Sequence, residues 1–299
     1  LEGALKAAIV EDPQRFVDLD PGIVTTLRDQ RLAGKQLLLV TNSEWSYTRR
    51  MMSWCFDDLM PDGETWRDLF DLVVVAAAKP RFFAEVGPVY RVVDEERGLL
   101  EPHWGELRPG DVYHGGNAGM VEEALGHDPS QFLYVGDHLF GDVHVTKDVL
   151  RWRTCLIARE LEAEIEAAAA FAHDEVRLRE MMTDKTALEA AHARARMTRR
   201  RLVVAEADRA DADAEIERLA GAIAAVDREI APLARAATEQ GNAVWGPLMR
   251  AGVDKSLFAR QVEKYADVYT SRVSNFADAT PYAYLRAARG TLPHDRVGR

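Results

Sequence analysis

The chain has 299 residues, of which 47% are hydrophobic, and its formal net charge is -11 at pH 7. These values predict a folded protein with one large domain or two ordinary ones. The acidic balance argues against nucleic acid as the main partner, because binding a phosphate backbone requires a basic surface. A small phosphorylated ligand remains compatible, since it needs only a local positive site.

Two further features of the composition indicate a cytoplasmic protein. No apolar run reaches the roughly 18 residues that a membrane span requires, so no membrane partner is expected. The two cysteines, Cys55 and Cys155, lie far apart in the sequence and are expected to be reduced thiols rather than a disulfide or a metal site.

Helical and strand patterns alternate over the first 158 residues, which predicts an α/β domain with a parallel sheet. The aliphatic run Leu37–Val40 is typical of a strand that is buried on both faces. The elements expected in chain order are helices at 1–15 and 21–31, a strand at 37–40, a helix at 44–60, a strand at 72–75, an antiparallel hairpin or flap within 89–113, a helix at 119–125, a strand at 132–135, a helix at 143–150 and a strand at 152–157.

Polar side chains follow three of the predicted strands. Thr41 and Asn42 follow the first, Lys79 follows the second and Asp137 follows the third. The carboxyl ends of parallel strands share one edge of a sheet, so we expect these side chains to meet there. A hydroxyl and an amide can hold phosphate oxygens, an ammonium can neutralise them, and a carboxylate can bind Mg²⁺.

Each of these residues also has an ordinary structural explanation. Asn42 or Ser43 alone would be a helix cap, Lys79 alone a surface lysine, and Gly136-Asp137 alone a turn. The joint pattern favours a phosphate site, with Asp142 orienting Lys79 or a metal-bound water. Because Pro80 disfavours helix at the preceding residue, Lys79 is expected at an extended strand end. The segment His114–Asn117 is expected to be a structural loop.

Composition changes sharply after Glu160, where the chain becomes rich in Ala, Glu, Arg and Asp and has no glycine until Gly221. This predicts a long helical hairpin with its bend at Asp208–Asp213 and a kink at Pro232. One apolar seam with heptad spacing is expected to pack within the chain rather than against a partner. The alternative is that the hairpin mediates self-association into a homo-oligomer. The seam consists of Ile216, Leu219, Ile223, Val226, Ile230 and Leu233.

The last sixty residues return to a mixed composition that is rich in aromatic side chains. They are expected to form a helical segment that packs back on the α/β body. The predicted organisation is therefore an α/β core over residues 1–158, a helical hairpin over 159–240 and a C-terminal segment over 241–299.

Three segments resemble motifs II, III and IV of the haloacid dehalogenase (HAD) superfamily, and their wider context resembles the cytosolic purine 5′-nucleotidase family. The superfamily motifs are Leu39-Val40-Thr41-Asn42-Ser43, Lys79-Pro80 and Gly136-Asp137-x4-Asp142. The narrower resemblance is carried by Thr41-Asn42-Ser43-x3-Tyr47-Thr48, Phe70-Asp71-Leu72, Lys79-Pro80-x-Phe82-Phe83, Tyr134-Val135-Gly136-Asp137-His138-Leu139-Phe140-Gly141-Asp142, Leu257-Phe258-x2-Gln261-Val262-x2-Tyr265-Ala266-Asp267-x-Tyr269, Pro281-Tyr282-x-Tyr284-x-Arg286 and Pro293-His294.

The resemblance implies a HAD-like Rossmannoid parallel sheet and hydrolysis of a nucleoside 5′-monophosphate, preferably a 6-oxopurine such as IMP or GMP. An aspartate attacks phosphorus and forms an aspartyl-phosphate, which water hydrolyses. Carried over by motif, Thr41, Asn42 and Lys79 hold the phosphoryl group, Asp137 binds Mg²⁺ and Asp142 supports the site.

Some members of the family are activated by a nucleotide effector. Phe140, Gln261 and Tyr265 match positions at that effector site. Lys264 stands where some relatives have arginine, and this difference weakens the expectation of effector binding.

The chain departs from the superfamily at motif I, a strand followed by Asp-x-Asp that carries the nucleophile. The one candidate, Asp18-Leu19-Asp20, follows only two apolar residues and leads directly into the next helix, so it is rejected. The resemblance therefore predicts that the nucleophile, the central strand and the cap precede Leu1, and that these residues are the C-terminal, by themselves inactive, part of the enzyme. The alternatives are a catalytically inactive nucleotide-binding or scaffold relative, and a HAD phosphatase that acts on another small phosphate ester.

Overall fold

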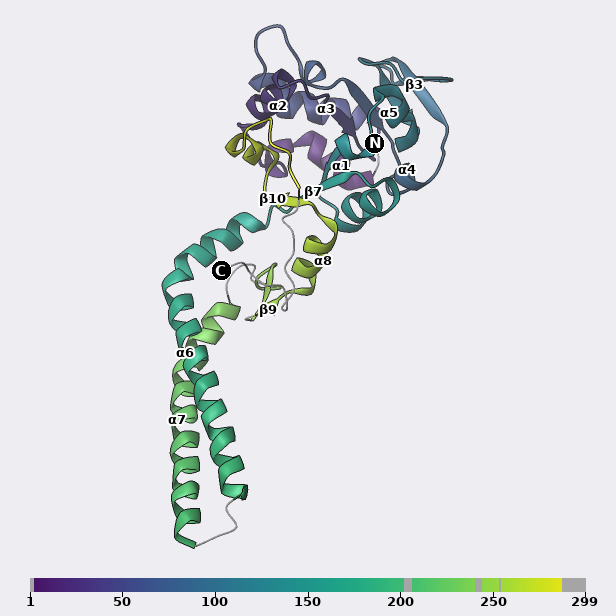
Figure 1. The fold of residues 1–299 in the computed structure, drawn as a ribbon. Helices are drawn as coiled ribbons and strands as arrows, with labels where there is room; N and C mark the ends of the chain where they lie inside the picture. Colours follow the sequence, from purple (N-terminus) through teal and green to yellow (C-terminus); the bar gives the residue numbers. More distant parts are fainter. Residues whose placement is uncertain (1–2, 202–205, 240–243, 253, 287–299) are drawn as a thin grey trace. The chain divides into compact units, whose positions relative to one another are not determined.

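Figure 1 shows a computed structural model of the chain that describes residues 3–201, 206–239, 244–252 and 254–286. The chain divides into two compact units, one formed by Leu1–Arg159 with Gln261–Arg299 and the other by Glu160–Arg260. The fold is mixed α/β, with largely parallel sheets and a long helical region, which confirms the predicted class. The predicted motif Pro293-His294 lies outside the described residues.

The first unit contains a five-stranded sheet in the order β1-β2-β5-β3-β4. The first three strands in this order are parallel to one another, with Leu39 opposite Val73 and Val73 opposite Val112. The predicted flap is confirmed, because β3 and β4 pair in antiparallel fashion and β3 also pairs antiparallel with β5. The strand bounds are β1 Leu38–Val40, β2 Leu72–Val75, β3 Val89–Asp94, β4 Leu99–Pro102 and β5 Val112–Gly115.

A second, three-stranded parallel sheet has the order β10-β7-β6. Its strands are β6 (Leu133–Gly136), β7 (Arg153–Ile157) and β10 (Val268–Thr270). The tail of the chain thus supplies a strand, with Val268 opposite Cys155. No ladder joins β1 to β6 among the described residues, so the parallel strands lie in two sheets, which is compatible with the incomplete parallel sheet that was predicted.

The strand β2 carries the core on both of its faces. Leu72 and Val74 belong to a cluster that includes Phe83, Tyr113, Tyr134 and Trp152. Val73 and Val75 belong to a second cluster, around Trp45 and Trp66. Because successive side chains of a strand point to opposite faces, one run of four aliphatic residues supports both layers.

The strands β1 and β6 are less buried than the sequence predicts. All four residues of β2 are buried, whereas every residue of β1 and all but Tyr134 of β6 are partly exposed. The prediction that Leu37–Val40 is buried on both faces is therefore wrong. The physical reason is that β1 and β6 each border their sheet, with a partner strand on one side only among the described residues.

Helices and short helical turns connect the strands (Figure 1). The predicted helix over 44–60 ends early at Phe56 and continues as a 3-10 turn, and the helix predicted over 143–150 is present as two π-helical segments. The helices are α1 Gly3–Glu11, α2 Ile23–Leu32, α3 Trp45–Phe56, α4 Arg81–Ala84, α5 Ala118–Leu125 and α8 Leu257–Tyr265, and the short segments are η1 Pro13–Arg15, η2 Asp57–Leu59, η3 Trp66–Leu69, η4 Pro129–Gln131, η5 Leu139–His144, η6 Thr146–Leu150 and η7 Val273–Asp278.

The second unit contains the predicted helical hairpin, formed by α6 (Leu161–Arg201) and α7 (Glu206–Thr238), which run side by side (Figure 1). Ion pairs join the two helices, with 2.6 Å from Lys185 Nζ to Asp227 Oδ1 and 2.9 Å from Arg199 Nε to Asp213 Oδ1. Leu219 and Ile230 of the predicted seam are buried. Two short strands, β8 (Arg250–Ala251) and β9 (Asp254–Lys255), pair in this unit.

The predicted position of the bend is wrong. Asp208–Asp213 lies inside α7, and Asp213 receives two hydrogen bonds from Arg199 of the neighbouring helix. This acidic stretch is therefore compatible with helix here, and the Arg199 guanidinium of α6 neutralises one of its carboxylates, that of Asp213. Pro232 also lies within α7.

None of the helices in the described ranges combines the length with the apolar character needed to cross a membrane.

Asp267 attaches the tail of the chain to the second sheet. Its carboxylate accepts hydrogen bonds from the backbone N–H of Thr154 at 3.0 Å and from Lys147 Nζ at 3.1 Å. The Thr154 hydroxyl in turn donates to the backbone oxygen of Tyr265 at 2.8 Å. These bonds hold the start of β10 against β7.

We predict that Asp267→Asn lowers the free energy of unfolding by about 2 kcal/mol, because a charge-assisted hydrogen bond is lost in a half-buried position. Urea denaturation followed by tryptophan fluorescence measures this loss. The control is Asp29→Asn, on the exposed face of α2, which should change the free energy by less than about 0.5 kcal/mol. Equal effects of the two substitutions would contradict the proposed attachment.

Candidate functional site

The loop after β1 is shaped by its own polar groups. The backbone N–H of Thr41 donates to Val74 O at 2.9 Å, which continues the pairing with β2. The Thr41 hydroxyl oxygen accepts a hydrogen bond from Ser43 N at 3.1 Å. The expectation that Asn42 or Ser43 caps the next helix is wrong, because the N-cap residue of α3 is Glu44. The short side chains of the loop bond elsewhere.

Asn42 braces the backbone of Lys79. Its amide nitrogen donates to Lys79 O at 3.1 Å, and its amide oxygen accepts from Lys79 N at 2.6 Å. This pair of bonds joins the loop after β1 to the loop after β2. Two of the sequence-predicted site residues are thereby brought together.

Lys79 lies in a turn rather than at an extended strand end, so that prediction is wrong. The strand β2 ends at Val75, and Ala76 and Ala78 then adopt positive φ values of 46° and 57°. Such angles are unfavourable for alanine and cost on the order of 1–3 kcal/mol each. The surrounding bonds, including Ala76 N to Ser43 O at 2.9 Å, hold this turn in place.

The Lys79 ammonium pairs with the carboxylate of Asp142, which lies in η5, the helical segment that follows β6 of the second sheet. Lys79 Nζ lies 3.0 Å from Asp142 Oδ1, and the two side chains are only 16% and 5% exposed. Tyr134 Oη is 2.8 Å from the same ammonium and 3.3 Å from Asp142 Oδ1. The geometry matches the expectation that Asp142 orients Lys79.

Asp142 is itself held closely by the segment after β6. Its Oδ2 atom accepts a hydrogen bond from His138 N at 3.1 Å, and its backbone N–H donates to His138 O at 2.9 Å. Gly136 passes so near that a Cβ atom on it would lie 2.6 Å from Asp142 Cβ. Glycine is therefore required at position 136 for Asp142 to approach Lys79.

The hydroxyl of Tyr134 stays protonated in this setting. Burial raises its pKa far above the ordinary value, and the negative charges of Asp142 and Asp137 act in the same direction. A neutral hydroxyl can donate to Asp142 while it accepts from Lys79.

Asp137 differs from Asp142 in being exposed and in making no hydrogen bond or ion pair with the described residues. Its carboxylate therefore remains available. Mg²⁺ commonly keeps several waters and is held by one or two carboxylates together with substrate phosphate oxygens. A single open carboxylate beside phosphate-binding groups fits this ion, although no group of three or more potential metal ligands occurs in the described part of the chain.

Two residues that sequence reasoning missed reach the site. Lys6 of α1 places Nζ 3.2 Å from Ser43 Oγ, so a second cation lies at the Thr41 loop. No pattern in residues 1–15 signals this contact, which depends on how α1 packs on α3. Tyr134 did have a signal, since a tyrosine within an aliphatic strand has a hydroxyl that needs a partner once it is buried.

The residues matched to an effector site are partly brought together. The ring of His144 lies 5.4 Å from that of Phe140 and 4.1 Å from that of Tyr265, measured between centroids. Gln261 lies one turn before Tyr265 on α8, on the same face of that helix. Lys264 Nζ lies 4.8 Å from the centre of the Tyr265 ring.

Asp18 and Asp20, the pair rejected as motif I, lie away from the candidate site and contact other residues. Asp18 is 68% exposed and pairs with Arg159 and Arg272, and the bond to Arg159 lowers its pKa. Asp20 accepts a hydrogen bond from Gly22 N at 3.2 Å, at the start of α2. Neither carboxylate contacts Thr41, Lys79 or Asp137 in the described structure, which agrees with the rejection.

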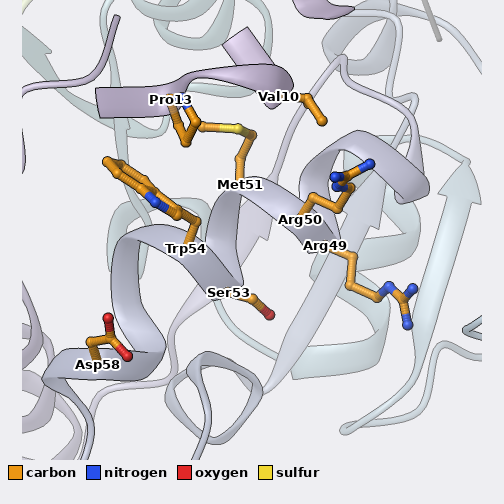
Figure 2. Close-up of a pocket in the computed structure, with 8 residues that line it drawn as sticks. All are labelled: Val10, Pro13, Arg49, Arg50, Met51, Ser53, Trp54 and Asp58. Carbon is orange, nitrogen blue, oxygen red and sulfur yellow. The ribbon is translucent and has the colours of Figure 1, made fainter. Parts of the chain in front are cut away.

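A hollow of about 540 Å³ lies between the α1–η1 segment and α3, and it does not include the candidate site. Figure 2 shows Pro13, Met51 and Trp54 gathered at one end, while the guanidinium groups of Arg49 and Arg50 point away from the indole. Its remaining lining residues are Val10, Ser53 and Asp58. The guanidinium groups and the other polar side chains of this hollow do not converge on a common point, unlike the polar groups at the strand ends.

Comparison with known proteins identifies the group to which these features belong. A family model described as the 5′ nucleotidase family matches residues 1–297. A 5′-nucleotidase domain-containing protein of Dictyostelium discoideum is 25% identical over 299 residues, an alignment that covers 99% of this chain and 46% of the relative. The chain thus spans about half the length of the curated relative that it matches.

We predict that Gly136→Ala displaces Asp142 and destabilises the protein by about 1–3 kcal/mol, as is typical when an atom is forced into a packed position. Thermal or urea denaturation measures the loss. Gly221→Ala is the control, since a Cβ at this exposed helical position meets nothing within 4 Å and should stabilise α7 by up to about 1 kcal/mol. A neutral effect of Gly136→Ala would show that Asp142 does not need this close approach.

Proposed function

Because the chain belongs to the 5′ nucleotidase family, we propose that the natural protein hydrolyses nucleoside 5′-monophosphates to nucleoside and phosphate. The observation that carries this proposal is the cluster of Thr41, Asn42, Lys79 and Asp142 at the strand ends of the first unit. A fixed ammonium beside a hydroxyl-bearing loop is suited to a dianionic phosphoryl group.

The residues of this chain have separate tasks in the proposed reaction. The Thr41 hydroxyl oxygen already accepts from Ser43 N, so its own proton is available to a phosphoryl oxygen. Lys79 supplies positive charge, and its orientation is maintained by Asp142. Asn42 acts mainly as a brace, because its amide oxygen and one of its N–H groups are used by the backbone of Lys79.

The proposed cofactor is Mg²⁺, held by Asp137. The ion would offset the negative charge of the phosphoryl oxygens during transfer. Asp137 suits this task because its carboxylate is exposed and unpaired among the described residues, whereas both oxygens of Asp142 are already engaged.

We further propose the HAD-type route through an aspartyl-phosphate, on the strength of the motif resemblance. A carboxylate oxygen would bond to phosphorus while the bond from phosphorus to the nucleoside O5′ breaks and that oxygen takes up a proton. Water would then cleave the acyl phosphate and restore the carboxylate. Asp18 and Asp142 are both engaged in other contacts, so neither is proposed as the attacking carboxylate.

Preference for a 6-oxopurine nucleotide and activation by a nucleotide effector are also proposed from the resemblance. Phe140 and Tyr265 support an effector site because each ring contacts the ring of His144, and aromatic side chains are suited to stacking against a base. Turnover of IMP, GMP, AMP and a sugar phosphate by the full-length natural protein tests the substrate class. Faster turnover of the sugar phosphate than of IMP would favour the other phosphatase function.

We predict that Asp137→Asn in the full-length protein lowers Mg²⁺-dependent hydrolysis of IMP at least about 10-fold, because even residues that only support a metal ligand typically cost about 10–100-fold when they are substituted. Released phosphate is measured over a Mg²⁺ titration. The control is Asp29→Asn, which lies on the outside of α2 and should leave the rate unchanged. Near-normal activity of Asp137→Asn would refute the metal role, and an inactive wild-type protein that still binds phosphate would favour a binding or scaffold relative.

A further inference from the structure

The hydroxyl group of Tyr134 occupies the space between the two charged members of the site. Its oxygen lies 2.8 Å from Lys79 Nζ and 3.3 Å from Asp142 Oδ1, and these two charged atoms are 3.0 Å apart. The three groups form a closed triangle that joins the loop after β2 to the segment after β6.

The ring of Tyr134 is fixed by the core. It meets the Phe83 ring edge-on, with centroids 5.0 Å apart at 84°, and lies 6.5 Å from the Trp152 ring. Tyr134 is 9% exposed and pairs with Thr154 of β7 in the sheet. A rigid ring on a strand therefore places the hydroxyl, whereas the lysine stem that it contacts has four rotatable bonds.

Two of the three N–H groups of the Lys79 ammonium have partners within the site. Lys79 has three N–H groups, of which one faces Asp142 Oδ1 and another faces Tyr134 Oη. The tyrosine proton is directed to Asp142, and the second oxygen of Asp142 is occupied by His138 N. One N–H of the ammonium therefore remains for a ligand. Because an ammonium is tetrahedral, fixing the directions of two of its N–H bonds also fixes the direction of the third.

We propose that Tyr134 is a positioning residue, whose hydroxyl fixes the Lys79 ammonium so that its remaining N–H points to a phosphoryl oxygen of the bound substrate. This inference rests on the proposed function, in which Lys79 binds the phosphoryl group. Asp142 alone would leave the ammonium free to rotate about one contact. The second contact with Tyr134 removes that freedom before the substrate arrives.

The test is Tyr134→Phe in the full-length natural protein with Mg²⁺ present. Binding of inorganic phosphate is measured directly by phosphorus NMR titration, and binding of inosine is measured by calorimetry. We expect the substitution to weaken phosphate binding about tenfold, the usual effect of losing one hydrogen bond to a charged group. Inosine binding should change by less than about twofold, because the nucleoside has no phosphoryl group.

Tyr113→Phe is the matched control. Tyr113 is also buried in the same core cluster, and its hydroxyl accepts from Arg108 N at 2.8 Å and contacts Asp111 at 3.3 Å, without a contact to Lys79. This variant should lose comparable thermal stability and keep normal phosphate binding. The difference between the two variants thus separates positioning of Lys79 from a general effect on folding.

Three outcomes would overturn the inference: unchanged phosphate binding in Tyr134→Phe, equal weakening of phosphate and inosine binding, or an equal loss of phosphate binding in Tyr113→Phe. The titration does not depend on turnover. A wild-type protein that binds phosphate but fails to hydrolyse IMP would therefore contradict the proposed function and leave the role of Tyr134 to be decided by the same measurements. A wild-type protein that binds no phosphate would contradict both.

Discussion

The ion pair between Lys79 and Asp142 is the contact on which the candidate site depends. Lys79 follows β2 of the five-stranded sheet, and Asp142 follows β6 of the three-stranded sheet, so this pair links the two sheets. Removing two charges from water costs several kcal/mol per ion, and the cost is offset only when geometry and additional hydrogen bonds are favourable. Here Tyr134 and the backbone of His138 supply those bonds. A nearly buried pair of this kind is weak as a source of stability and well suited to holding an ammonium in one place.

The polypeptide around this pair is arranged to support it. Gly136 leaves room for Asp142, and the left-handed turn at Ala76 and Ala78 brings Lys79 to the carboxylate. Asn42 then fixes the backbone of Lys79 through two hydrogen bonds. Unfavourable backbone angles persist only where the surroundings determine them strongly, and such positions gather at functional sites. The local geometry and the proposed phosphate chemistry thus indicate the same region.

In both sheets, the strand at one edge is directly followed by residues of the candidate site: β1 by Thr41 and Asn42, and β6 by Asp137. The strands β1 and β6 are bordered on one side only among the described residues, and their aliphatic side chains are partly exposed. Unpaired strand edges carry backbone groups that favour an added strand.

The sequence by itself determined the α/β class, the strands of the first 158 residues, the flap, the helical hairpin and the identity of the polar residues after the strands, but not the strands β8, β9 and β10 in the segment that was predicted to be helical. These features depend on local signals, namely aliphatic runs, heptad spacing and turn residues, which operate over a few neighbours in the chain. Only the tertiary structure decided that the strands form two sheets, that β1 borders one of them, and that Asp208–Asp213 stays helical, with Asp213 paired to Arg199 of α6. It also revealed Tyr134 and Lys6 at the site. Their contacts join residues 55 and 37 positions apart in sequence, and such contacts are set by the packing of whole elements rather than by any local pattern.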